Sequence, residues 1–284
     1  MSGHQDEMSF WDHLEALRWT LFRCIIALIV FTIGGLIFTP FLFDHVILAP
    51  VESDFILYRL LCKATTSIPY FPNFCDDTYH VNVFNVGLGT EFFTYISSSF
   101  YLAVMLTFPY LVFEIWKFVR PALYENEKKN MRWVFSFGTV MFFVGCAVGY
   151  FLVFPMTVRF LATFKLSTFI EEDQSSLESY MGYFITLIFA MGIVFEMPLV
   201  AWFLSKLGLL KRSFFNKYRR HAVVGLLVAA AFITPSSDPF TLSCVFFPLY
   251  GLYELSAFFV KKDKKEEDEE ESAEIVKYDA EYKE

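Results

Sequence analysis

The chain lacks the short motifs that mark common enzymes. It contains no His-Glu-x-x-His, no Gly-x-Ser-x-Gly and no Cys-x-x-Cys, and its five histidines are scattered over different segments. A metal centre or an activated nucleophile needs such residues at a fixed spacing. The sequence therefore predicts no catalytic residue and no metal site.

Charged residues are also scarce. They make up only 19% of the 284 residues, whereas 56% are hydrophobic and 37 residues are Phe. This is more apolar surface than a soluble domain of this size can bury. Most of the formal net charge of -8 comes from residues 261–284, which are predicted to be a disordered charged tail. Residues 1–11 lack a basic leader pattern, so we expect no cleaved targeting segment.

Long apolar runs dominate the rest of the chain. A helix of about 20 apolar residues crosses the roughly 30 Å hydrocarbon core of a bilayer. The pattern predicts an all-α polytopic membrane protein in which residues 19–260 form a six-span domain, with Pro40 closing the first span and Pro155 the third. The predicted spans are 19–38, 91–118, 131–154, 180–204, 221–233 and 240–260.

The distribution of Lys and Arg predicts the orientation of these spans. Nineteen of the 23 basic residues fall in the two termini and in the second and fourth loops, and four fall in the loops of the opposite side. Basic loops stay in the cytoplasm, so both termini, including the amphipathic segment 1–18, are predicted to be cytoplasmic.

The first loop, about residues 39–89, is then external and contains Cys62 and Cys75. An external compartment permits a disulfide between them, although two unpaired thiols remain the alternative. Residues 52–64 of this loop have helical periodicity, which predicts a cap over the bundle.

A few charged residues occupy unusual places. Glu196 lies inside the fourth predicted span, where an ionisable group is costly unless it faces protein or water. Glu254 in the sixth span is a weaker candidate of the same kind. Glu127 follows the second span, beside two lysines, and on spacing alone it is typical of a solvated surface. Phe118 is typical of an interfacial anchor.

Four short motifs resemble one known family. Residues 13–18 read HLEALR and resemble the H-L-x-E-L-R signature of the TatC family, and residues 118–127 resemble its F-x-x-P-A-L-Y-x-x-E loop. Residues 195–198 resemble its F-E-x-P, and Thr234-Pro235 followed by Asp238 resembles its T-P-x-D turn. The resemblance covers about residues 9–260 and places the motifs in the family's order.

The resemblance implies a function. It implies the core receptor of the twin-arginine translocase, a multi-pass protein of the bacterial inner membrane, with a glove-like concave bundle and an external cap. The implied partners are twin-Arg signal peptides of folded precursors, single-span TatA and TatB subunits, other TatC copies and membrane lipid, with no nucleic acid. The resemblance also implies export driven by the proton-motive force, and it implies no cofactor.

The resemblance also implies site residues. Glu196 and Pro198 are implied in an intramembrane partner contact, and Asp238 and Pro235 in an external turn. The residues implied in signal-peptide binding are Glu127, Phe118, Glu15, Arg18, Pro121, Leu123 and Tyr124.

Two positions depart from the family pattern. The family's first glutamate aligns with Ala16, and Glu15 lies one residue earlier, which turns it by about 100° around a helix. The turn T-P-S-S-D has one residue more than T-P-x-D. A small secondary transporter with Glu196 as an ion site remains an alternative, although the two halves show no internal repeat. A purely structural scaffold is a third reading.

Overall fold

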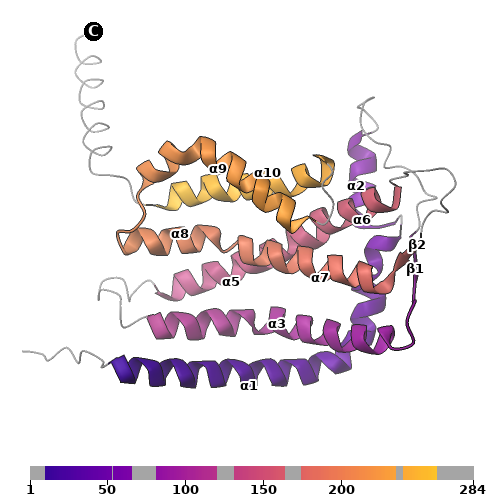
Figure 1. Cartoon of the computed structure of the whole chain (residues 1–284), viewed down its shortest axis with the longest axis horizontal. Helices are drawn as coiled ribbons and strands as arrows, with labels where there is room; N and C mark the ends of the chain where they lie inside the picture. The colour runs from indigo at the N-terminus through magenta and orange to yellow at the C-terminus, as the bar shows by residue number, and fades with distance from the viewer. Residues whose placement is uncertain are drawn as a thin grey trace, which may run out of the picture. The chain divides into compact units, whose positions relative to one another are not determined.

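The computed structural model describes residues 10–52, 54–65, 81–119, 131–163, 174–234 and 239–260. The chain divides into two compact units, residues 1–192 and 193–284. The first unit contains α1 (Phe10–Leu42), α2 (Ile56–Thr65), β1 (Asn82–Phe84), α3 (Thr90–Val119), α5 (Met131–Val148), α6 (Phe154–Thr163), β2 (Gln174–Ser176) and most of α7 (Leu177–Val194) (Figure 1). The second contains α8 (Met197–Lys206), α9 (Arg212–Ile233) and α10 (Pro239–Phe259).

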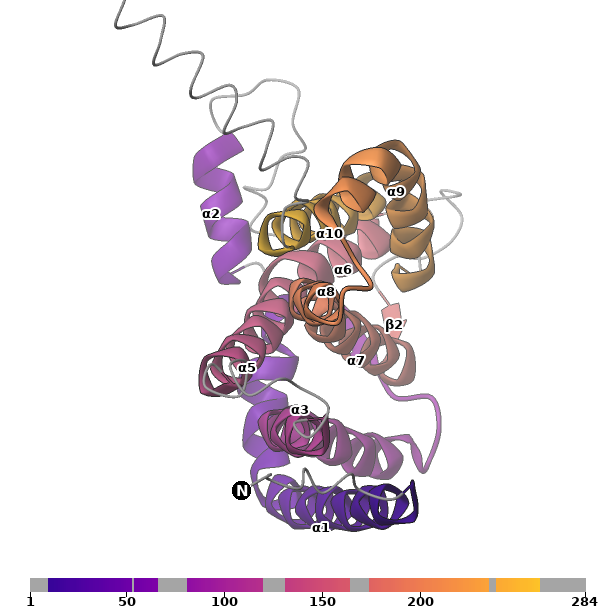
Figure 2. The same cartoon turned by 90° about the vertical axis from the view of Figure 1, so that its left-hand side faces the viewer.

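Helices α1 and α3 form an antiparallel pair, seen side by side in both views (Figures 1 and 2). They approach most closely at Gly35, where an added Cβ would lie 2.9 Å from the backbone oxygen of Ser99. Next to this contact the hydroxyls of Thr39 and Ser99 share a hydrogen bond of 2.7 Å. Small residues permit such close packing in lipid, where water cannot drive helix association.

The prediction that Pro40 closes the first span is wrong. Helix α1 continues through Pro40 to Leu42 and then into a π-helical turn, Phe43–Ile47. A proline inside a helix leaves the carbonyl four residues earlier without its donor. Here that carbonyl belongs to Leu36, and the hydroxyl of Tyr95 donates a hydrogen bond to it. Helix α3 therefore supplies the bond that Pro40 removes from α1.

The irregular segment after α1 is held by tyrosines from other elements. Residues 43–51 form a π turn followed by a 3-10 turn in place of a regular α-helix. Backbone groups must find protein partners wherever water is excluded. The bonds run from the Tyr150 hydroxyl to the carbonyl of Val46 at 2.8 Å, from the Tyr180 hydroxyl to that of Ile47, and from the Tyr58 hydroxyl to those of Pro50 and Pro155 at 3.3 and 2.9 Å.

The prediction that Pro155 ends the third span is also wrong. A π turn, Gly149–Val153, follows α5, and α6 continues to Thr163. The change of register places Pro155 in the first turn of α6, where a missing N–H is tolerated. Gly149 also brings the π turn against α7, because an added Cβ would lie 2.9 Å from the Cα of Ile188.

Short elements complete the predicted external side of the first unit. Strands β1 and β2 pair in parallel, with Asn82 opposite Gln174 and Phe84 opposite Ser176, a pairing that the sequence patterns did not predict. Helix α2 begins at Ile56, just after the buried Phe55, whose ring stacks on Phe151 of the π turn. The predicted periodicity of residues 52–64 is therefore a helix over 56–65, while its place as a cap stays a prediction.

The second unit is a three-helix arrangement around a small core. Ala201, Phe215, Ala257 and Val260 are buried together, and the Tyr253 hydroxyl donates to the carbonyl of Phe215 at 2.8 Å. The turn from α8 to α9 passes through Gly208, whose positive φ of 75° suits a residue without a Cβ. The short α8–α9 connection therefore lets both helices pack on α10.

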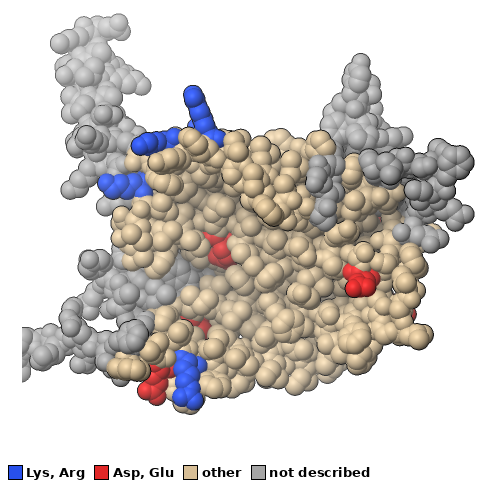
Figure 3. Space-filling view, in the orientation of Figure 1, with Lys and Arg blue, Asp and Glu red and all other residues tan. Residues whose placement is uncertain are grey.

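The fold class is confirmed: the chain is an all-α polytopic membrane protein. Within the described ranges, the segments long and apolar enough to cross a membrane are Leu14–Val51, Thr90–Ile115, Ser136–Ala162, Leu177–Lys206 and Thr241–Phe259. Helix α9 begins nine residues before the predicted fifth span and is basic in its first half, so a span over 221–233 stays a prediction. Figure 3 shows a face of mostly uncharged residues.

Two neighbouring glycines of α1 give a matched test of the α1–α3 contact. A Cβ at Gly35 would collide with the backbone of Ser99, whereas one at Gly34 meets no atom within 4 Å. We expect Gly35→Ala to destabilise the folded chain by about 1–3 kcal/mol, and Gly34→Ala to be neutral or slightly stabilising because Ala favours a helix. Thermal unfolding of both variants in detergent measures the difference. Equal stabilities would contradict this close contact.

Candidate functional site

The described part of the predicted binding surface lies at one end of the α1–α3 pair. The N-terminal turns of α1 carry Glu15 and Arg18, and the last turn of α3 carries Phe118. Because the helices are antiparallel, these residues lie at the same end of the pair (Figure 1). The other predicted residues of this surface, Glu127, Pro121, Leu123 and Tyr124, lie outside the described residues.

The exposed side chains at this end are charged and aromatic. Glu15 and Arg18 are exposed, and the Arg18 guanidinium lies over the ring of Phe22, 5.6 Å from its centroid. Ala16, at the position of the family's glutamate, is only half-buried. Phe118 is half-buried as well. This end of the pair therefore presents a carboxylate, a guanidinium and aromatic rings together.

Sequence reasoning missed one ionisable residue beneath this surface. Glu114 lies four residues before Phe118 on α3, and its side chain is only 3% exposed. The Tyr110 hydroxyl donates to its Oε1 at 3.1 Å, and Nη2 of Arg23 on α1 lies 3.3 Å from its Oε2. The sequence does contain a signal for Glu114, because it is an acidic residue within the predicted span 91–118. Glu196 has the same feature within 180–204.

Glu196 lies where the predicted fourth span is interrupted. Helix α7 ends at Val194, a turn covers residues 195–196, and α8 begins at Met197 with Pro198 in its first turn. Glu196 occupies the N-cap position without a side-chain cap hydrogen bond. Its Oε1 is buried and accepts no hydrogen bond from the residues that the structure describes. A buried carboxylate oxygen with an unused acceptor is costly and marks a position for a polar partner.

Glu254 has a partner in its own unit. Nε of Arg219 on α9 donates to its Oε1 at 2.6 Å, and Nη2 of the same guanidinium donates to its Oε2. This fork is a bidentate ion pair between α9 and α10. The structure therefore gives Glu254 a structural role, as the weaker of the two intramembrane candidates.

The other predicted residues are described only in part. Cys62 is disulfide-bonded, but Cys75 lies outside the described residues, so their pairing stays a prediction. Asp238 and Pro235 also lie outside them. The described start of that turn is Thr234, which is buried and donates its hydroxyl to the carbonyl of Ala230 at 2.9 Å.

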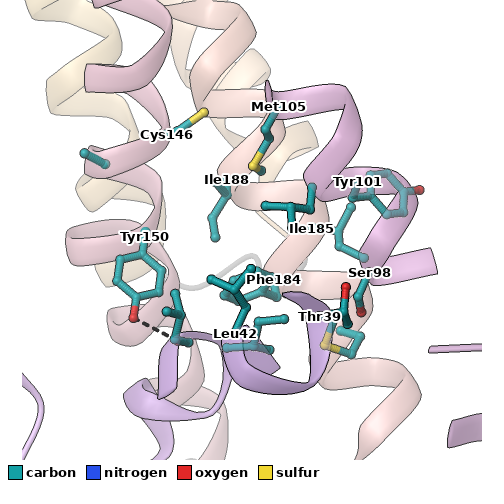
Figure 4. Close-up of a pocket in the computed structure, with 15 residues that line it drawn as sticks. Thr39, Leu42, Ser98, Tyr101, Met105, Cys146, Tyr150, Phe184, Ile185 and Ile188 are labelled. Carbon is teal, nitrogen blue, oxygen red and sulfur yellow. Dashed lines mark hydrogen bonds between the residues drawn. The ribbon is translucent and has the colours of Figure 1, made fainter. Parts of the chain in front are cut away.

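An apolar cavity of about 260 Å³ lies within the first unit (Figure 4). Its walls come from α1 and the π turn after it, α3, α5 and α7, and they include Leu42, Met105, Phe184 and Ile188. Its lining has no ionisable carboxylate, amine or imidazole. Among the described residues no group of three His, Cys, Asp or Glu is placed to hold a metal ion.

Comparisons with known proteins all point to one family. The family model described as Sec-independent protein translocase protein (TatC) matches residues 12–248. A protein of that name from Blattabacterium sp. is 34% identical over 268 residues, covering 93% of this chain and 100% of its own length. One from Desulforapulum autotrophicum is 32% identical over 280 residues, covering 97% of this chain and 94% of its own length.

Solved structures agree. Two crystal structures described as the twin arginine translocase receptor TatC, one of them in the detergent DDM, match with TM-scores of 0.67 and 0.68 and 26% identity. They cover 87% and 88% of this chain, which in turn covers 97% and 99% of theirs.

Proposed function

Because the chain belongs to the TatC family of Sec-independent protein translocase subunits, we propose that it is the receptor that binds twin-Arg signal peptides of folded precursors. It is a multi-pass inner-membrane protein and a transport component rather than an enzyme. The observation that carries the proposal is the family match over residues 12–248, which contains both motifs of the proposed binding surface. Family membership decides against the small secondary transporter.

The proposed surface combines Glu15, Arg18 and Phe118 with the loop that carries Glu127. An arginine side chain stays charged at all relevant pH values, and its planar fork prefers carboxylates in a bidentate arrangement. Glu127 is the principal carboxylate in this proposal. The proposal also includes Pro121, Leu123 and Tyr124, which lie between Phe118 and Glu127 in the sequence, and Phe118 offers an aromatic face to a guanidinium. The peptide is captured on the predicted cytoplasmic side.

Glu196 has a separate role in the proposal. Its buried Oε1 offers an acceptor for the transmembrane helix of a TatA- or TatB-type subunit, or for the inserted signal helix. The break before Pro198 places this carboxylate at the start of α8, beyond the last residue of α7. Assembly with these partners, and with further copies of the chain, then completes a translocase driven by the proton-motive force.

Replacement of Glu127 tests the proposed surface. We expect Glu127→Gln to abolish export of a folded reporter with a twin-Arg signal while the protein accumulates normally in the membrane, because an amide cannot pair with a guanidinium as a carboxylate does. The matched control is Glu125→Gln, which removes the same charge two residues earlier and should export normally. Normal export by the Glu127 variant, or an equal loss in the control, would reject Glu127 as the principal carboxylate.

Replacement of Glu196 tests the partner contact. We expect Glu196→Leu to reduce co-purification of the single-span subunits about tenfold, whereas Glu196→Gln retains it, because Gln keeps a hydrogen-bonding group in the same place. Glu178→Leu is the control, since Glu178 is an exposed carboxylate in the first turn of α7. Unchanged co-purification by Glu196→Leu would contradict the proposed contact.

A further inference from the structure

Glu114 is a buried carboxylate with a hydrogen bond to only one of its two oxygens from the described residues. Its side chain is 3% exposed, and the Tyr110 hydroxyl fixes Oε1 through a hydrogen bond of 3.1 Å. Its Oε2 is also buried, and it accepts no hydrogen bond from any residue in the described ranges. Nη2 of Arg23 lies at ion-pair distance, 3.3 Å, but without hydrogen-bond geometry. Oε2 can therefore still accept a hydrogen bond from a guanidinium.

Arg23 is held loosely at this position. Its side chain is 43% exposed, and Nη2 donates to the Thr20 hydroxyl over 3.5 Å, a long contact. Arg219 and Glu254 in the second unit form a bidentate pair for comparison. Nε of Arg219 donates to Oε1 of Glu254 at 2.6 Å, and Nη2 donates to Oε2. A bidentate guanidinium–carboxylate pair is stronger than a single misaligned contact. A better-placed guanidinium would therefore displace Arg23 from Glu114.

The carboxylate lies next to the proposed peptide surface. Glu114 and Phe118 are four residues apart on α3 and so lie on the same face, one turn apart. On α1, Arg23 lies about two turns from Glu15. A peptide with two arginines presents two guanidinium groups, and the proposed function assigns one principal carboxylate, Glu127. Glu114, a buried acceptor one turn before Phe118, could bind the second guanidinium.

We propose that Glu114 is the second arginine-binding carboxylate, and that Arg23 occupies it as an internal competitor until a signal peptide arrives. This inference rests on the proposed function. The exchange replaces one guanidinium by another, so the buried carboxylate never loses its counter-charge. Removing one partner of a buried ion pair without replacement is strongly unfavourable, and this exchange avoids that step. Arg23, already half-exposed, moves into solvent.

The competition has a measurable consequence. When an internal group occupies a binding site part of the time, the apparent affinity for the ligand falls. It equals the intrinsic affinity multiplied by the fraction of molecules whose site is free. We expect Arg23→Gln to bind a labelled twin-Arg signal peptide about fivefold more tightly than the unaltered chain, the size of one partly exposed ion pair. Glu114→Gln should bind more weakly, because the second guanidinium loses its carboxylate.

The double variant separates competition from general charge. If Arg23 acted only through its general positive charge, its removal would favour a cationic peptide with or without Glu114. Competition for Glu114 requires Glu114 to be present. We therefore expect the Arg23→Gln gain to vanish when Glu114→Gln is also present. A gain of the same size in both backgrounds would overturn the inference, and so would unchanged or weaker binding by Arg23→Gln alone.

The experiment uses the full-length chain in detergent, with fluorescence anisotropy as the binding readout and thermal unfolding as the folding check. Should Arg23→Gln fail to fold, Arg23→Met takes its place, because Met keeps an unbranched side chain without the charge. Glu114→Gln that binds as tightly as the unaltered chain would overturn the inference by itself. Binding that Glu127→Gln abolishes but Arg23→Gln leaves unchanged would overturn it and leave the proposed function standing. No binding by the unaltered chain would overturn both.

Discussion

The need to pair every backbone carbonyl and N–H inside a membrane governs the first unit. In lipid no water replaces a missing partner, so each irregular backbone segment must be bonded by protein. Pro40 removes a donor from Leu36, and Tyr95 of α3 replaces it. The π and 3-10 turns after α1 leave further carbonyls, which the hydroxyls of Tyr58, Tyr150 and Tyr180 bond. These bonds tie α1 to α3, α7 and the start of α2, so the departures from regular helix also connect the helices.

The same constraint makes the buried acids informative. Glu114 and Glu196 each have a buried carboxylate oxygen without a hydrogen bond from the described residues, within segments predicted to lie in the membrane. Glu254, by contrast, is closed by a fork from Arg219. A carboxylate that the fold itself satisfies is structural, whereas one left with an open acceptor is suited to a partner from outside. This distinction separates Glu254 from Glu114 and Glu196.

The sequence was sufficient for the class of protein and its family, because hydropathy and motif order are properties of the chain itself. It was insufficient where contacts from another helix decide whether a helix continues. Pro40 and Pro155 are typical helix terminators, and only Tyr95 and the π turn at Gly149 explain why the helices continue. The parallel pairing of β1 with β2 joins residues more than 90 positions apart and has no local pattern. Glu114 was overlooked because its neighbours Trp116 and Lys117 resemble a membrane boundary, while its burial depends on α1.

We propose that the end of the α1–α3 pair, together with residues 120–132, receives the two arginines of a signal peptide. The most direct measurement is a photocrosslinking scan, with a probe placed in turn at residues 12–18 and 118–132 and a labelled twin-Arg peptide as the ligand. We expect crosslinks that concentrate near Glu15, Phe118 and Glu127 and disappear when both arginines of the peptide become lysine. Crosslinks that are absent from these two ranges, or that persist with the twin-Lys peptide, would contradict it.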